Sequence, residues 1–148
     1  MDLNLPQFQP RIRRSESGRA SIYDPIRRRY VALTPEEFVR QAFVAFLTGE
    51  KGYPAGLLAN EIQIELNGTK KRCDSVVFDR RGEPLMIIEY KAPTIALTPA
   101  VFDQVLRYNA VLRARYFIMS NGLKHICFDM SERRFLREIP DFSELLVV

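Results

Sequence analysis

The chain has 148 residues, 47% of them hydrophobic and 27% charged, which are the usual proportions of a globular domain. No apolar run reaches the roughly 20 residues that cross a bilayer, and the start MDLNLPQFQPRIRR lacks the basic-then-apolar order of a secretory signal. These features exclude a membrane or secreted protein, so we expect one cytoplasmic domain in which Cys73 and Cys127 stay reduced.

The net charge of +4 is unevenly distributed. Residues 1–30 hold seven arginines against Asp2, Glu16 and Asp24, whereas the rest of the chain has fifteen basic and fifteen acidic side chains. Such a segment can neutralise nucleic-acid phosphates, but a solvated terminus has the same composition, and charge alone does not decide between them. We therefore predict a basic arm or edge segment over 1–30 and a folded domain over 31–148.

The first elements are a weak strand and a clear helix. Residues 1–20 look irregular, and 21–33 are expected to hold a short strand or edge segment. A helix is predicted over 35–48, because Thr34 is a good N-cap and the proline after it suits the first helical position. Glu37 stands where a capping box needs an acidic residue.

Three strands are predicted next, over 61–66, 72–79 and 84–91. Asn67-Gly68 between the first two is a strong hairpin signal, and a second tight turn containing Gly82 joins the second to the third. The third strand begins with a continuous apolar run, LMII, which is typical of a central strand covered on both faces.

A second helix is predicted over 99–113, followed by strands over 116–120 and 125–129 and a final edge strand within 134–139. Because a helix joins the third and fourth strands, a right-handed crossover makes those two parallel. The sequence therefore predicts an α/β fold with a mixed sheet and the order α-β-β-β-α-β-β.

Hairpin register brings three carboxylates together. If Asn67-Gly68 forms a two-residue loop, Glu61 lies opposite Asp74. If the next turn centres on Arg81-Gly82, Asp74 lies opposite Glu89. Opposed residues have Cβ atoms about 4.5–5.5 Å apart, where like charges destabilise a sheet. A hard divalent cation such as Mg²⁺ or Mn²⁺ would offset that repulsion.

Strand alternation places Lys91 on the same face as Glu89, with Tyr90 on the other face. A metal-binding carboxylate row beside a fixed ammonium suits phosphodiester hydrolysis. The metal would activate a water, and the lysine would orient or deprotonate that water and stabilise the developing charge.

Asp74, fourteen further residues and then Glu89-Tyr90-Lys91 resemble the D…ExK signature of the PD-(D/E)xK nucleases, whose restriction-endonuclease-like core has the order αβββαβ. More specifically, residues 30–125 look like the N-terminal nuclease domain of type I restriction enzyme R subunits. The likeness lies in the segments LTPEEFVRQ, KGYP, NGTKKRCDSVVFDRRGEPLMIIEYKAP, FDQVLRYN and SNGLKH.

This resemblance implies that Asp74 and Glu89 bind metal and that Lys91 is catalytic. Gln104 and Tyr108 resemble a Q-x3-Y motif in which the glutamine helps to arrange the site. Cys73 stands where the signature often has proline, a common variation.

Several of these residues also have simpler interpretations. Glu37 resembles the acidic residue that the first helix of such nucleases contributes to the metal site, but a capping box alone explains it. Glu61 follows from register and not from the family motif, and Gln104 is compatible with a solvent-facing helix position. His125 is expected to be structural. Nucleic-acid contacts are predicted for basic residues of the arm and of the first hairpin, namely Arg27, Arg28, Arg29, Lys70 and Lys71.

The leading hypothesis is a Mg²⁺- or Mn²⁺-dependent endonuclease acting on DNA in restriction. The alternative is a nucleic-acid-binding or partner-docking module with little catalysis, and a third is a structural protein. No G-x4-G-K-[ST] loop is present, so we expect no ATP site in this chain. A homodimer or a larger restriction or repair complex stays open, as does DNA versus RNA.

Overall fold

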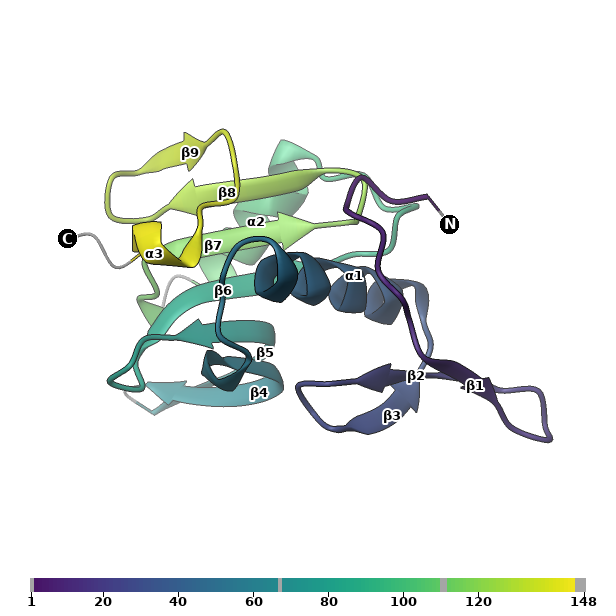
Figure 1. Ribbon diagram of the computed structural model, residues 1–148. Helices are drawn as coiled ribbons and strands as arrows, with labels where there is room; N and C mark the ends of the chain where they lie inside the picture. The colour runs from purple at the N-terminus through teal and green to yellow at the C-terminus, as the bar shows by residue number, and fades with distance from the viewer. Residues whose placement is uncertain (1, 67, 110–111, 146–148) are drawn as a thin grey trace.

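A six-stranded mixed sheet forms the centre of the molecule (Figure 1). The computed structural model describes residues 2–66, 68–109 and 112–145, apart from the side chains of Leu66 and Tyr108. Its elements are β1 (Ile12–Arg14), β2 (Ala20–Asp24), β3 (Arg29–Ala32), α1 (Pro35–Gly49), the 3-10 turn η1 (Ala55–Leu57), β4 (Leu58–Leu66), β5 (Thr69–Phe78), β6 (Pro84–Tyr90), α2 (Pro99–Asn109), β7 (Tyr116–Ser120), β8 (His125–Asp129), β9 (Arg134–Leu136) and α3 (Phe142–Leu145).

The strand order of this sheet is β4-β5-β6-β7-β8-β9. Its pairs are antiparallel except for β6 and β7, which are parallel and joined through α2. The predicted α/β class and the parallel crossover are therefore confirmed. Of the predicted helix over 99–113, α2 is described to Asn109, and residues 110 and 111 lie outside the described part of the chain.

The helices α1 and α2 cover opposite faces of the sheet (Figure 1). Val39, Phe43 and Leu47 of α1 pack on one face, and Phe102 of α2 belongs to the cluster on the other. The centre of β6 alternates between the two clusters, because Met86 and Ile88 join the first and Ile87 joins the second. The continuous apolar run thus corresponds to a central strand, with about 1.5–3 kcal/mol gained for each fully buried large side chain.

The predicted hairpin registers are confirmed on both sides of β5. Ile62 pairs with Cys73 across the first hairpin, and Ser75 pairs with Ile88 across the second. Glu61 interrupts the first ladder with a φ of 53°, in the left-handed region that non-glycine residues rarely adopt. This interruption changes the site, as described below.

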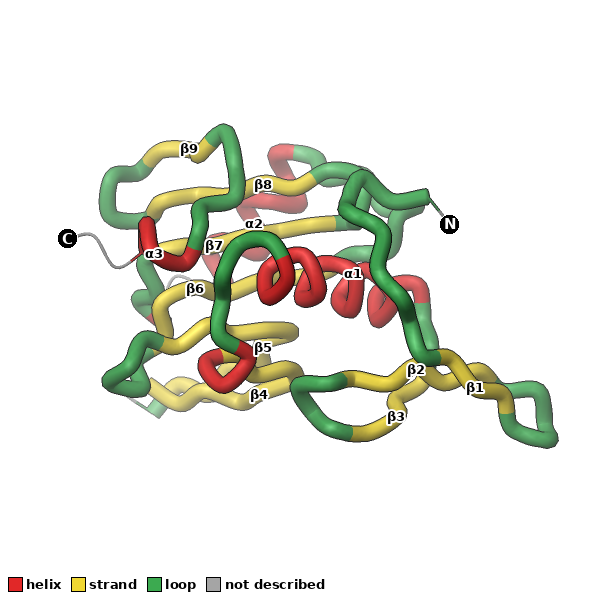
Figure 2. Tube along the Cα trace, viewed as in Figure 1, coloured by secondary structure: helices red, strands yellow, loops and turns green. Residues whose placement is uncertain are grey.

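The N-terminal segment differs from the expectation. Residues 12–14 form β1 where an irregular chain was expected, and β1, β2 and β3 make a separate antiparallel sheet below α1 (Figure 2). Ile22 and Asp24 of β2 are fully buried, so β2 is anchored to the body of the molecule. The predicted division at residue 30 falls within β3 and remains a prediction. None of the helices in the described ranges is long and apolar enough to cross a membrane.

Candidate active site

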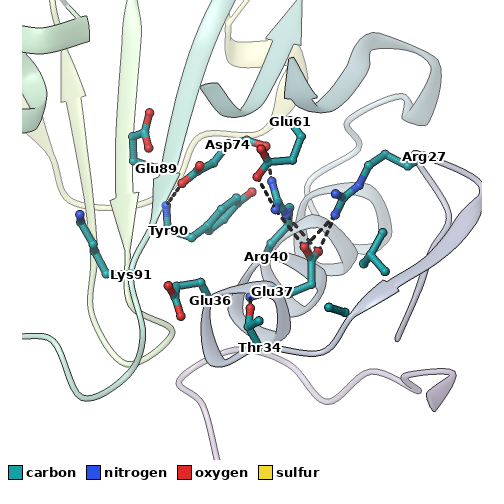
Figure 3. Close-up of a pocket in the computed structure, with 12 residues that line it drawn as sticks. Arg27, Thr34, Glu36, Glu37, Arg40, Glu61, Asp74, Glu89, Tyr90 and Lys91 are labelled. Atoms are coloured by element: carbon teal, nitrogen blue, oxygen red, sulfur yellow. Dashed lines mark hydrogen bonds and ion pairs between the residues drawn. The ribbon is translucent and has the colours of Figure 1, made fainter. Parts of the chain in front are cut away.

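A polar cleft of about 530 Å³ lies where the middle of β5 and the end of β6 meet α1 and β3 (Figure 3). Its lining includes Glu36 and Glu37 of α1 and Asp74 of β5. Glu89 near the end of β6 and Lys91, the first residue after this strand, also line it. The residues of the predicted D…ExK signature therefore meet in one cleft, although strands and turns separate them in sequence.

Asp74 and Glu89 lie at the point where β5 and β6 separate. The ladder between these strands is last paired at Ser75 and Ile88, and the next backbone amide of β6 to bond with β5 reaches a side chain instead. The Tyr90 N–H donates to Asp74 Oδ2 at 2.9 Å, which fixes the aspartate carboxylate at the strand end.

Burial and the neighbouring Asp74 carboxylate raise the pKa of Glu89 to about 8. Two neighbouring carboxylates suit a hard divalent cation, because Mg²⁺ and Mn²⁺ prefer carboxylate oxygens as ligands and retain several waters. The chemistry of Asp74 and Glu89 thus fits such an ion. Across the described ranges, however, no group of three or more His, Cys, Asp or Glu is placed to hold a metal.

Lys91 follows β6 directly, and its N–H donates to the Ser120 carbonyl of β7 at 2.9 Å. Figure 3 shows Glu89 and Lys91 on the same side of the strand, while the Tyr90 ring points the other way, toward Arg40. The predicted alternation along this strand is confirmed. The ammonium lies at the same cleft wall as the carboxylate pair.

Glu37 belongs to a different arrangement. Thr34 Oγ1 accepts from the Glu37 N–H at 3.0 Å, so the predicted N-cap is confirmed. The Glu37 carboxylate instead accepts from Arg27, Arg40 and Gln41 at 2.8–2.9 Å. Burial alone would raise the pKa of Glu37, but these donors, Arg40 first, hold it below its usual value. Its oxygens are thus engaged by two guanidinium groups.

Glu61 is also engaged by arginines. Its carboxylate accepts from Arg40 at 2.7 Å and from Arg72 at 3.0 Å. Although burial acts in the opposite direction, these hydrogen bonds lower the pKa of Glu61. The three-carboxylate row expected from register therefore does not form, because Glu61 departs from regular strand geometry and pairs with cations of the protein itself.

Arg40 is a central residue that the sequence analysis missed. It is 7% exposed, and it donates to Glu37, to Glu61 and to the main-chain oxygen of Asp74. One signal was available, because Arg40 interrupts the apolar face of the first helix between Val39 and Ala42. A cation at such a position needs buried anionic partners.

Comparison with known proteins identifies the family of this chain. Residues 35–141 match the family model described as type I restriction enzyme R protein N terminus. The chain belongs to this family. A solved structure, the fragment of a putative HsdR subunit of a type I restriction enzyme from Vibrio vulnificus YJ016, matches with a TM-score of 0.57 and 17% identity. The match covers 77% of this chain and 25% of that one, so this R-protein N-terminal domain spans about a quarter of its relative's length. No curated protein matches.

In this R-protein N-terminal domain, Asn109 of α2 reaches the carboxylate pair. Its Nδ2 donates to Glu89 Oε1 at 3.3 Å, and its buried Oδ1 has no hydrogen-bond partner within the described ranges. Gln104, the residue suggested by the Q-x3-Y motif, is exposed and lines a separate surface hollow, and the side chain of Tyr108 lies outside the described residues. In the sequence, Asn109 stands at the end of FDQVLRYN, one of the segments that resemble the R-subunit nuclease domain.

The basic residues predicted to contact nucleic acid have different environments. Arg27 is 13% exposed and is paired with Asp24 and Glu37, whereas Arg28 and Arg29 are exposed. In the first hairpin, Lys70 is exposed and Lys71 is half-buried, and the positive charge of Lys71 acts against the rise in the pKa of Glu89. Their roles remain predictions.

Proposed function

We propose that this R-protein N-terminal domain is a Mg²⁺- or Mn²⁺-dependent endonuclease that hydrolyses phosphodiester bonds of DNA. The observation that carries the proposal is the meeting of Asp74, Glu89 and Lys91 in one cleft, where β6 ends and separates from the middle of β5. Membership of a restriction enzyme family supplies the nuclease context. The substrate and the metal are inferred from the chemistry of this cleft.

Asp74 and Glu89 would hold the metal ion, which when bound polarises the phosphoryl group and lowers the pKa of a water. Lys91 then orients or deprotonates the attacking water and stabilises the negative charge that develops on the phosphate. The Tyr90 N–H and the Asn109 amide hold the two carboxylates in place. Such positioning groups commonly change metal affinity or activity by about 10–100-fold.

We further propose that the domain acts within a larger restriction complex. The solved relative is a fragment of a restriction enzyme subunit, and its match to this chain covers 25% of that fragment. One observation favours the second candidate, a nucleic-acid-binding or partner-docking module with weak catalysis. Within the described ranges no third acidic residue joins the pair in a group that could hold a metal, and Glu37 and Glu61 are engaged by arginines.

Nicking of supercoiled plasmid in EDTA, Mg²⁺ and Mn²⁺ tests the proposal, with wild type compared with Lys91→Met and Asp74→Asn. We expect metal-dependent nicking that each variant lowers by about 100-fold or more. Arg80→Gln, in an exposed turn away from the cleft, should keep full activity. Equal nicking by all four proteins would identify a contaminant and overturn the mechanism. No nicking together with intact DNA binding would favour the second candidate.

A further inference from the structure

Arginines stack on tyrosines across the sheet of β1, β2 and β3. The guanidinium carbon of Arg11 lies 4.4 Å from the ring centroid of Tyr23, and that of Arg13 lies 3.9 Å from the centroid of Tyr30. The two rings contact each other edge to face, with centroids 5.3 Å apart. Stacking occupies the flat face of a guanidinium and leaves its N–H edge available, so both side chains are ordered before any ligand arrives.

The four stacked residues share the outer face of this sheet. Tyr23 pairs with Tyr30, and the Tyr23 N–H donates to the Arg11 carbonyl. Ile22, the neighbour of Tyr23 along β2, is fully buried and therefore points inward. Arg11 and Arg13 are both exposed.

The excess positive charge of the whole chain lies in this N-terminal segment. Asp24 is fully buried and bound by Arg27, so it does not offset the surface charge. Asp2 and Glu16 are the exposed acidic residues of 2–30. Against them stand the exposed arginines Arg11, Arg13, Arg14, Arg19, Arg28 and Arg29.

The sheet that carries these arginines is also a wall of the candidate active site. Val31 and Ala32 of β3 line the cleft. Asp24 of β2 accepts from Asn60 of β4 at 3.0 Å, and Asn60 in turn accepts from the Ser75 hydroxyl of β5 at 2.6 Å. These buried bonds fix the N-terminal sheet against the strand that carries Asp74. From there, β1 and its following turn project away from the body of the molecule (Figures 1 and 2).

We propose that the arginine face, defined as Arg11 and Arg13, binds the phosphate backbone of duplex DNA and leads it to the cleft, with Arg14 and Arg19 adding positive charge at the tip that follows. The choice of DNA rests on the proposed function, whereas the phosphate-binding surface rests on its own geometry. Arg11 directly precedes β1 and Arg13 lies within it, so their Cα atoms are about 6.6 Å apart in extended backbone. That distance corresponds to about two phosphates of one DNA strand along the duplex axis.

The stacking also favours a duplex over a single strand. Proteins that bind single strands usually present aromatic rings on which successive bases stack. Here Arg11 and Arg13 each cover one ring face of Tyr23 and Tyr30, which leaves the outer surface with guanidinium groups where bases would stack. The surface is suited to phosphates held by a duplex.

Fluorescence anisotropy with a labelled duplex in EDTA, over a series of salt concentrations, tests this surface. Arg11→Gln/Arg13→Gln removes both positive charges and keeps a planar, polar group at the end of a shorter side chain. Arg80→Gln/Arg81→Gln, in the exposed turn between β5 and β6, removes the same charge at the opposite end of Figure 1. We expect the first pair to weaken binding roughly tenfold and to reduce the slope of log K against log salt by about 1.8, at about 0.9 per phosphate. The control pair should stay within about twofold.

Equal losses in both pairs, or no loss in either, would overturn the proposal. Tighter binding of a single-stranded oligonucleotide than of the duplex, lost in Arg11→Gln/Arg13→Gln, would overturn the duplex assignment. Circular dichroism checks folding, and Arg14→Gln/Arg19→Gln at the exposed tip supplies a second test if the first pair is misfolded. Because EDTA prevents cleavage, the outcome is independent of nuclease activity. If the protein never nicks DNA but its binding depends on the arginine face, the proposed function is contradicted. The proposal that this surface binds DNA is then still supported.

Discussion

Besides Glu36, the carboxylates that line the cleft form two pairs, and the partners of the two pairs differ. Glu37 and Glu61 are bound by Arg27, Arg40 and Arg72, and the pKa of each is lowered. Asp74 and Glu89 face each other instead, and the pKa of Glu89 is raised to about 8. The candidate metal ligands are therefore the pair that stands apart from this arginine network, Asp74 and Glu89.

The largest effect is expected from Arg40→Met. Removing this buried cation leaves Glu37 and Glu61 without their shared partner, and breaking a buried ion pair typically costs about 3–5 kcal/mol. Urea unfolding measures the loss. Arg72→Met is the matched control, because its side chain is 66% exposed and its pair with Glu61 should contribute about 1 kcal/mol or less. Similar losses in both variants would show that the buried Arg40 contributes no more to the free energy of unfolding than the exposed Arg72 does.

A smaller effect of opposite sign is expected from Glu89→Gln in metal-free buffer. In the unfolded chain this carboxyl loses its proton near its ordinary pKa of 4.5, and in the folded protein it keeps the proton until about pH 8. Rising pH therefore favours the unfolded state across this window, and the variant escapes that penalty. We expect a gain on the order of 1–3 kcal/mol at pH 8 that disappears below about pH 4.5.

Glu37→Gln sharpens this comparison, because it removes a charge that Arg27 and Arg40 stabilise. It should lower the free energy of unfolding at pH 8, where Glu89→Gln raises it. Destabilisation by both variants would contradict the division into two groups.

A change in metal affinity rather than in stability is expected from Asn109→Ala. Loss of the amide that holds Glu89 should weaken Mn²⁺ binding by about tenfold, as for other groups that orient a ligand. Isothermal titration measures this. Gln104→Ala should bind Mn²⁺ like the wild type, because Gln104 is exposed outside the cleft. A larger loss in Gln104→Ala would instead support the role implied by the Q-x3-Y motif.

The smallest effect concerns His125, outside the cleft. Its Nδ1 lies 2.7 Å from Ser120 Oγ and its Nε2 lies 2.8 Å from the Asn4 carbonyl. Burial lowers its pKa below the usual 6.5, so the unfolded state takes up a proton first as the pH falls. Stability should therefore decline below about pH 6.5, by about 1 kcal/mol or less, and His125→Gln should flatten this decline in thermal melts. An unchanged decline in His125→Gln would assign it to other groups.

The sheet and the carboxylate pair were predictable because their signals are local. As sequence signals, Asn67-Gly68 and the turn at Gly82 predict a register, and the observed pairs Ile62–Cys73 and Ser75–Ile88 agree with it, although Asn67 itself lies outside the described residues. The departure of Glu61 from the carboxylate row was not predictable, because the alternation of residue types along a strand does not reveal a positive φ.

Long-range partners were missed for a different reason. Arg40 bonds to Glu61 and to Asp74, which are 21 and 34 positions away, and no local pattern pairs them. The strand β1 is three residues long and two of these are arginines, so it lacks the apolar alternation that identifies a half-buried strand.

Mn²⁺ binding followed by isothermal titration tests the central claim most directly, with wild type, Asp74→Asn, Glu89→Gln and Glu61→Gln compared at one pH. We predict a single site that is lost in Asp74→Asn and in Glu89→Gln and retained in Glu61→Gln. Binding that survives both changes in the pair, or that Glu61→Gln abolishes equally, would contradict the assignment of Asp74 and Glu89 as the metal-binding carboxylates.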